Sequence, residues 1–109
     1  MPSSFSMLSR SEKTEFWQKI ASTIKEALRQ CEHQLPVGVT EDVSEYLEHN
    51  ELGLAWETLC GELINLEGVP SASAQQMILE AGIRMGFNEA GSQNHALLRK
   101  IASLFSCVG

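Results

Sequence analysis

The sequence lacks long apolar runs and a recognisable leader, and it has few cysteines. Each of these features argues against a class of protein. No stretch of the 109 residues approaches the roughly 18 consecutive apolar residues that span a membrane. The first residues lack a basic start followed by an apolar run, so we expect no secretory leader. The three cysteines, Cys31, Cys60 and Cys107, are an odd and widely spaced set. This pattern argues against a disulfide framework and favours reduced thiols in a cytoplasmic protein.

Motifs that carry catalytic or metal chemistry are also missing. The histidines His33, His49 and His95 stand alone, and the sequence has no His-x-x-x-His or Cys-x-x-Cys pair. Glu45 and His49 are four residues apart and could share a helix face, but two ligands do not complete a metal site. No glycine-rich loop has the spacing of a phosphate-binding motif. We therefore expect no metal, no cofactor and no enzymatic activity.

Lysine and arginine are absent between residues 30 and 83, although the chain has eight of them in all. The first 29 residues carry five bases and three acids, and the last 26 carry three bases and one acid, so each end has a net charge of +2. The middle carries ten acids and no base, which accounts for the overall charge of −6. This balance argues against direct binding of nucleic acid, because phosphate recognition needs a basic patch.

Apolar residues recur every three or four positions through most of the chain, and no window alternates like a strand. We therefore predict an all-α fold, a compact bundle of four to five helices in which adjacent elements pack together. Residues 1–10 are expected to be a flexible N-terminus, and residues 11–109 a single helical domain.

The first predicted helix begins at a capping box formed by Ser9 and Glu12. Its apolar stripe extends over residues 16–35, and Pro36 and Gly38 are expected to end it.

Three further helices are predicted from their caps and stripes. Thr40 is expected to cap a short helix that ends near residue 50, with Glu41 and Asp42 in its first turn. Asn50 is expected to cap the next helix, whose stripe covers residues 52–66; Gly53 and Gly61 would be tolerated there if another helix packs closely. A capping box of Ser73 and Gln76 starts a helix that runs to Gly86.

The last predicted helix follows a loop over residues 87–94 and is capped by Ser92 or Asn94. Of the two tryptophans, Trp56 is expected in the core, and Trp17 is expected at the edge of its stripe.

The acidic middle of the chain carries the functional argument. Glu41, Glu45 and Glu48 fall on one side of the short predicted helix, with no local base to offset them. Like charges four residues apart cost a helix about 0.2–0.5 kcal/mol per pair. One interpretation is a solvated face that keeps the protein soluble. The other is a negative surface that docks a basic partner, since complementary charge accelerates association.

The segment from Asp42 to Leu63, DVSEYLEHNELGLAWETLCGEL, resembles the core of the MafI-family immunity proteins of bacterial polymorphic toxin systems. The family pattern is a short helix ending in His-Asn-Glu, an aromatic or aliphatic residue, then Gly-Leu-Ala, an apolar residue and Glu. Here these places are held by residues 49–57, with Leu52 where many members have an aromatic. A helix from Ser73 to Met85 followed by Gly86 is also similar to the family, so the resemblance covers about residues 40–87.

The resemblance implies a small cytoplasmic protein that binds one cognate toxin domain and blocks it. Many such toxins are nucleases with basic surfaces, so an acidic inhibitor is physically reasonable. In the His-Asn-Glu corner we assign structural roles to Asn50, Gly53, Leu54 and Ala55. The expected partner-binding residues are the exposed side chains Glu41, Asp42, Glu45, Glu48, His49 and Glu51.

The expected function is therefore an immunity protein that neutralises a basic toxin C-terminal domain by stoichiometric occlusion, without contacting nucleic acid or membrane. A helical adaptor or regulatory module that binds another protein is the alternative, and a small hydrolase or metal protein is a third and weaker one. The sequence leaves the oligomeric state open.

Overall fold

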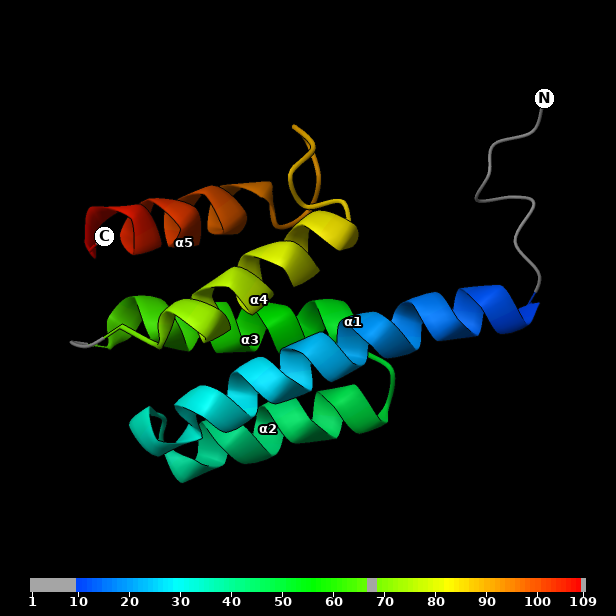
Figure 1. Cartoon of the computed structure of the whole chain (residues 1–109), viewed down its shortest axis with the longest axis horizontal. Helices are drawn as coiled ribbons and strands as arrows, with labels where there is room; N and C mark the ends of the chain where they lie inside the picture. The colour runs from blue at the N-terminus through cyan, green and yellow to red at the C-terminus, as the bar shows by residue number, and fades with distance from the viewer. Residues whose placement is uncertain (1–9, 67–68, 109) are drawn as a thin grey trace.

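The computed structural model describes residues 10–66 and 69–108, and this part of the chain is helical with no strand (Figure 1). Five α-helices follow one another: α1 (Arg10–Cys31), α2 (Val37–Glu48), α3 (Leu52–Asn65), α4 (Ala72–Arg84) and α5 (His95–Val108). A short 3-10 turn, η1 (Glu32–Gln34), links α1 to α2. The predicted all-α bundle is confirmed. The expected flexible segment 1–10 lies outside the described residues except for Arg10, which begins α1. Ser9 of the predicted capping box also lies outside them, whereas Glu12 lies within α1.

The first helix buries most of the predicted stripe, but it ends at Cys31, before the Pro36 that was expected to end it. Ile20, Ile24 and Cys31 are fully or almost fully buried. Pro36 then occupies the N-cap of α2, and its carbonyl accepts hydrogen bonds from the backbone N–H groups of Val39 and Thr40. Proline suits the start of a helix because its φ is preset and a donor there would be unpaired. Thr40 therefore lies inside α2, and the prediction that it caps this helix, with Glu41 and Asp42 in the first turn, is wrong.

Asn50 makes the corner between α2 and α3. Its φ of 59° lies in the left-handed region, where asparagine is one of the few side-chain-bearing residues that is readily tolerated. The N–H of Asn50 donates to the carbonyl of Leu47, and the N–H of Glu51 donates to the carbonyl of Tyr46. This pair of bonds is the Schellman arrangement that ends a helix. Asn50 thus closes α2, and Glu51, rather than Asn50 as predicted, is the N-cap of α3.

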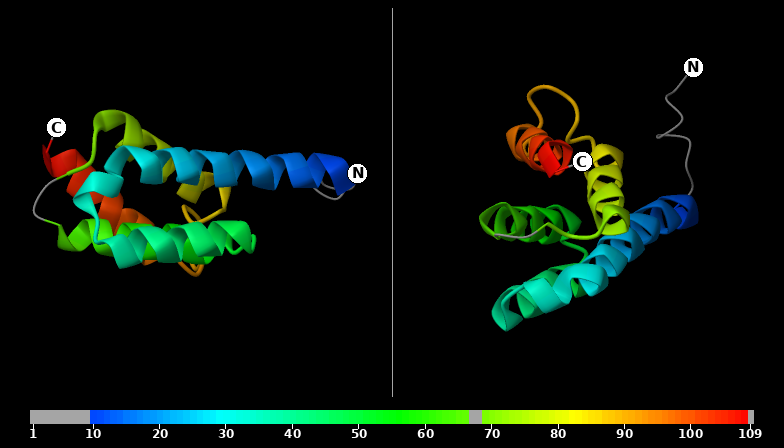
Figure 2. Two further views of the ribbon diagram at one scale, coloured as in Figure 1. Left: turned by 90° about the horizontal axis from the view of Figure 1, so that it is seen from below. Right: turned by 60° about the vertical axis from the view of Figure 1, so that its left-hand side comes forward.

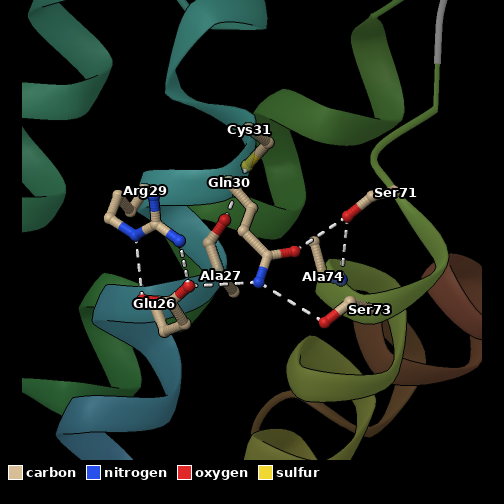
Figure 3. Close-up of polar contacts among 8 residues, drawn as sticks. All are labelled: Glu26, Ala27, Arg29, Gln30, Cys31, Ser71, Ser73 and Ala74. Carbon is tan, nitrogen blue, oxygen red and sulfur yellow. Dashed lines mark hydrogen bonds and ion pairs between the residues drawn. The ribbon is translucent and has the colours of Figure 1, made fainter.

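The fourth helix begins two residues before the predicted capping box. Ser71 is its N-cap, and the Ser71 Oγ accepts a hydrogen bond from the N–H of Ala74 at 3.2 Å. The same hydroxyl donates to the Gln30 Oε1 at 2.8 Å, and the Ser73 Oγ accepts from the Gln30 Nε2 at 3.4 Å (Figure 3). Ser73 is therefore a partner of α1 and not a cap.

These bonds belong to the main helix–helix contact of α1, which packs chiefly on α4, while α2 packs chiefly on α3. The expectation that adjacent elements pair therefore holds for α2 and α3 but not for α1. The N-terminal turns of α1 project beyond the ends of the other helices in each view (Figures 1 and 2).

One apolar cluster includes residues from all five helices, and Trp56 of α3 is its largest fully buried side chain. The Trp56 indole is fully buried, as predicted, and its Nε1–H donates to the carbonyl of Ile78 at 2.8 Å. Gly82 of α4 lies directly against this ring, where a Cβ would come within 2.7 Å of the Trp56 Cζ2. No such closeness exists at Gly61, and at Gly53 a Cβ would make an ordinary contact with Phe87 at 3.8 Å. The glycine that close packing requires is thus one that sequence reasoning missed.

Candidate functional site: an acidic face and an adjoining cleft

The acidic residues predicted to bind a partner are all exposed. Glu41, Glu45 and Glu48 lie three and four positions apart on α2, so they form one row along the helix. Val43 is fully buried against the core from the opposite side of α2. We call the following five exposed carboxylates the acidic face: Glu41, Asp42, Glu45, Glu48 and Glu51.

The corner at Asn50 brings His49 into this acidic surface. The His49 Nδ1 lies 2.9 Å from the carbonyl oxygen of Glu45, and the ring is exposed. This hydrogen bond, together with the nearby carboxylates of Glu45, Glu51 and Glu48, raises the pKa of His49 above its ordinary value. The imidazole therefore becomes positively charged more readily than a free histidine, and it titrates inside the acidic face.

The acidic face has no basic counterpart among the residues that the structure describes. The ion pairs found there join Arg29 to Glu26 within α1, and Arg84 to Glu80 within α4 at 2.9 Å. None of the five carboxylates of the acidic face takes part in a described ion pair. The local charge is therefore left for solvent, salt or a partner to neutralise.

A cleft of about 600 Å³ opens beside the acidic face and shares Glu51 with it. Three segments that are distant in sequence form its walls: the N-terminal half of α1, the corner leading into α3, and the connection between α4 and α5. The lining residues are Thr14, Trp17 and Gln18, then Asn50–Leu54 and Glu57, then Phe87, Gln93 and Asn94.

Two large apolar side chains of the cleft are exposed. Trp17 retains 39% of its accessible surface, in keeping with its predicted place at the edge of the stripe, and its ring meets Phe16 edge to face. Leu54 retains 43%, although it was assigned a structural role with Ala55. That assignment is wrong for Leu54 because the buried stripe of α3 runs through residues 52, 55, 56 and 59, which places Leu54 off its edge. Ala55 is fully buried, as expected.

The wall contributed by the α4–α5 connection is held by several contacts. Phe87 packs against Trp56 with ring centroids 5.1 Å apart. The carbonyl of Phe87 accepts a hydrogen bond from the Ser92 Oγ at 3.1 Å and lies 3.0 Å from the His95 Nδ1. Gly86, with a φ of 86°, ends α4 in a second Schellman arrangement, in which the N–H of Phe87 donates to the carbonyl of Gly82. The cleft is therefore preformed on this side.

Of the two residues expected to cap α5, Ser92 and Asn94, it is Asn94 that directly precedes the helix, and it is 8% exposed. Its backbone carbonyl accepts the first helical hydrogen bond, from the N–H of Leu98 at 2.9 Å. The side chain of Asn94 forms part of the cleft, so this residue connects the start of α5 to the candidate site.

The two cysteines with described side chains belong to the core. Burial raises the pKa of the Cys31 thiol to about 11, and it raises the pKa of the fully buried Cys60 well above its ordinary value. Both therefore remain protonated thiols at neutral pH, in the state in which cysteine is a poor nucleophile and a poor metal ligand. No group of three potential metal-ligating side chains occurs among the residues whose side chains are described, 14–66 and 69–106. No helix in the described part of the chain is long and apolar enough to cross a membrane.

Comparison with models of protein families, with curated proteins and with solved structures finds no match for this chain.

Proposed function

We propose that this protein is an immunity protein that binds a cognate bacterial toxin domain with a basic surface and blocks it by occlusion. The observation that carries the proposal is the acidic face, whose five exposed carboxylates have no ion-pair partner in the described part of the chain. The resemblance of the sequence over residues 40–87 to the MafI family supports the same proposal and suggests a toxin domain as the partner.

The acidic face suits a binding role better than a role in stability. In the row on α2, Glu45 lies four positions from Glu41 and three from Glu48, so each pair repels across one turn. Binding a basic surface would relieve this repulsion and neutralise both partners. Long-range attraction would also steer the encounter and raise the association rate at low salt. In this proposal the protein inhibits by covering its partner and catalyses no reaction.

The test is the triple charge reversal Glu41→Lys, Glu45→Lys and Glu48→Lys, co-expressed with a candidate toxin domain taken from the genes that neighbour this one. The wild-type chain should restore growth, and the triple variant should fail to do so and should bind the purified toxin domain at least tenfold more weakly. A matched control reverses Glu15, Glu32 and Glu89, which are exposed carboxylates outside the acidic face. The control variant has the same net charge as the test variant but leaves the acidic face intact, so it should retain protection. Equal loss in both triple variants would show that overall charge, and not this face, is responsible.

The alternative is a helical adaptor that binds a different protein. The exposed apolar side chains Trp17 and Leu54 give this alternative its support, because apolar surface beside polar residues is typical of interaction sites. Co-expression separates the two functions: an adaptor would leave the toxic cells unprotected, whereas an immunity protein would rescue them.

A further inference from the structure

The cleft beside the acidic face combines two kinds of side chain that single out one kind of ligand. Glu51 and Glu57 give it two carboxylates, and none of the described residues that line it is a lysine or an arginine. Trp17, Leu54 and Phe87 give it apolar and aromatic surface. A ligand that satisfies both needs an apolar stem and a cationic head.

The side chain of arginine has this composition. Its three methylene groups can lie along Leu54, and its planar guanidinium group can stack on an aromatic ring while donating to a carboxylate. Lysine offers a compact, strongly hydrated charge that stacks less well and donates in no fixed plane. A phosphate group is disfavoured in the same place, because both ionisable side chains among the described lining residues are acids.

The geometry of the cleft favours binding of a side chain from another protein. The volume of about 600 Å³ is ample for one long side chain and the backbone that carries it. Leu52 and Asn94 form a buried part of the lining, while Trp17 and Leu54 remain exposed at 39% and 43%. The ring contact between Phe87 and Trp56 holds one wall in place before any ligand arrives, which lowers the entropic cost of binding.

We infer that this cleft is a binding site for an arginine side chain of a protein partner, with Glu51 and Glu57 as the anionic residues and Trp17 as the aromatic wall. The inference rests on the proposed function only for the source of the arginine, which would be the basic surface of the toxin. The acidic face would then steer the encounter, and the cleft would hold one buried anchor, as a few buried arginines often do at interfaces.

The site can be tested without any toxin. The full chain, labelled with ¹⁵N, is titrated with Nα-acetyl-arginine methylamide, with the uncharged citrulline analogue as the control and sodium chloride added to equalise the ionic strength. We expect saturable shifts of the Trp17 indole N–H and of the amides of residues 50–54, with a dissociation constant on the order of 1–10 mM for so small a probe. The indole N–H of Trp56, which is buried and bonded to Ile78, serves as the internal reference.

Variants assign the interaction to the cleft. Glu51→Gln and Glu57→Gln should each weaken binding of the arginine probe about threefold, as expected for a partly exposed ion pair. Glu62→Gln, on the same helix but outside the cleft, should leave it unchanged. The lysine analogue should bind about threefold more weakly than the arginine probe.

Several results would overturn the inference. These are the absence of shifts at the cleft, equal shifts with citrulline, equal binding of lysine, and insensitivity to both glutamine variants. Concentration-dependent dimerisation that Trp17→Ala abolishes would show that a second copy of this chain occupies the cleft instead. Because the probe replaces the toxin, failure here leaves the proposed function standing. Conversely, loss of toxin binding with intact arginine binding in the Glu41, Glu45 and Glu48 triple variant supports both.

Discussion

The two main helix pairs of this protein, α1–α4 and α2–α3, differ in how their charged side chains are distributed. The α1–α4 pair carries both signs and contains one ion pair within each helix: Arg29 binds Glu26 and holds the pKa of that carboxyl at about 2, and Arg84 binds Glu80. The α2–α3 pair carries six acids and no lysine or arginine. The first pair is built like an ordinary solvated helix surface, whereas the second accepts repulsion that neighbouring bases could have removed. The proposed docking role would explain this difference, because a basic partner would neutralise the charge that the α2–α3 pair leaves unpaired.

The largest expected effect on stability lies where α4 of the first pair contacts α3 of the second, at Gly82 and Trp56. Gly82→Ala would place a Cβ within 2.7 Å of the Trp56 ring and 3.1 Å of the Leu98 Cδ1. The end of Leu98 can shift, but the rigid, fully buried indole of Trp56 cannot move away cheaply. We expect the free energy of unfolding to fall by about 2 kcal/mol, measured by urea denaturation. Gly61→Ala is the control, since a Cβ there meets nothing within 4 Å, and it should raise stability by about 0.5–1 kcal/mol. Equal effects at both glycines would contradict the close packing of α4 on Trp56.

The next largest effect on stability is expected from removing the polar contacts between α1 and the start of α4. Ser71→Ala removes the cap of α4 and the bond to Gln30, and it should cost about 1 kcal/mol of stability. Ser73→Ala removes only a 3.4 Å contact with Gln30, and it should cost less than about 0.5 kcal/mol. Thermal unfolding of the two variants separates them. A larger loss at Ser73 would restore the capping box that the sequence predicts.

Introducing one lysine into the row of glutamates on α2 tests whether the acidic face lowers the stability of the fold. Glu45→Lys turns the repulsions with Glu41 and Glu48 into attractions, and it should raise the free energy of unfolding by about 0.5 kcal/mol at low salt. Glu45→Gln, which removes repulsion without adding attraction, should give about half of that gain. The same lysine should weaken binding of the toxin, because stability and function make opposite demands on this position. Destabilisation by Glu45→Lys would contradict the view that the acidic face is costly to the fold.

The smallest effect is the pH dependence of His49. Its pKa is raised in the folded state, so its contribution to stability is fully present below about pH 6.5 and is lost as the pH rises through the folded value. Titration of the imidazole by NMR should show this raised pKa, and Glu48→Gln and Glu51→Gln should each lower it. The bond to the carbonyl of Glu45 is the largest cause of the shift, so neither variant should return the pKa fully to its ordinary value.

Much of the fold follows from local pattern. The stripes through Ile20 and Ile24 in α1 and through Trp56 and Leu63 in α3 are buried as predicted, because helical periodicity alone selects these positions. The row of exposed acids on α2 follows from the same periodicity, since it lies opposite the buried Val43.

The helix caps at Pro36 and Glu51 were missed among neighbouring residues, but the other errors arise where contacts between distant residues decide the outcome. Ser71 and Ser73 are both plausible caps, and Gln30, about 40 positions away, contacts both of them. The Gln30 amide oxygen accepts from Ser71, and its amide nitrogen donates to Ser73. The packing of α1 on α4, three helices later in the sequence, likewise has no local signal. The cleft could not be predicted either, because its walls come from residues 14–18, 50–57 and 87–94. Only the off-stripe positions of Trp17 and Leu54 indicated in the sequence that apolar side chains would be exposed there.

The most direct test of the central claim is the salt dependence of the rate at which this protein associates with the basic toxin domain that the proposed function assigns to it as a partner. For the wild type we expect the association rate constant to fall steeply as salt rises from low to physiological concentration, by about tenfold or more. The slope should flatten in the Glu41, Glu45 and Glu48 charge-reversal variant and should persist in the Glu15, Glu32 and Glu89 control. A wild-type rate that is indifferent to salt, or a slope that both triple variants change equally, would contradict a docking role for the acidic face.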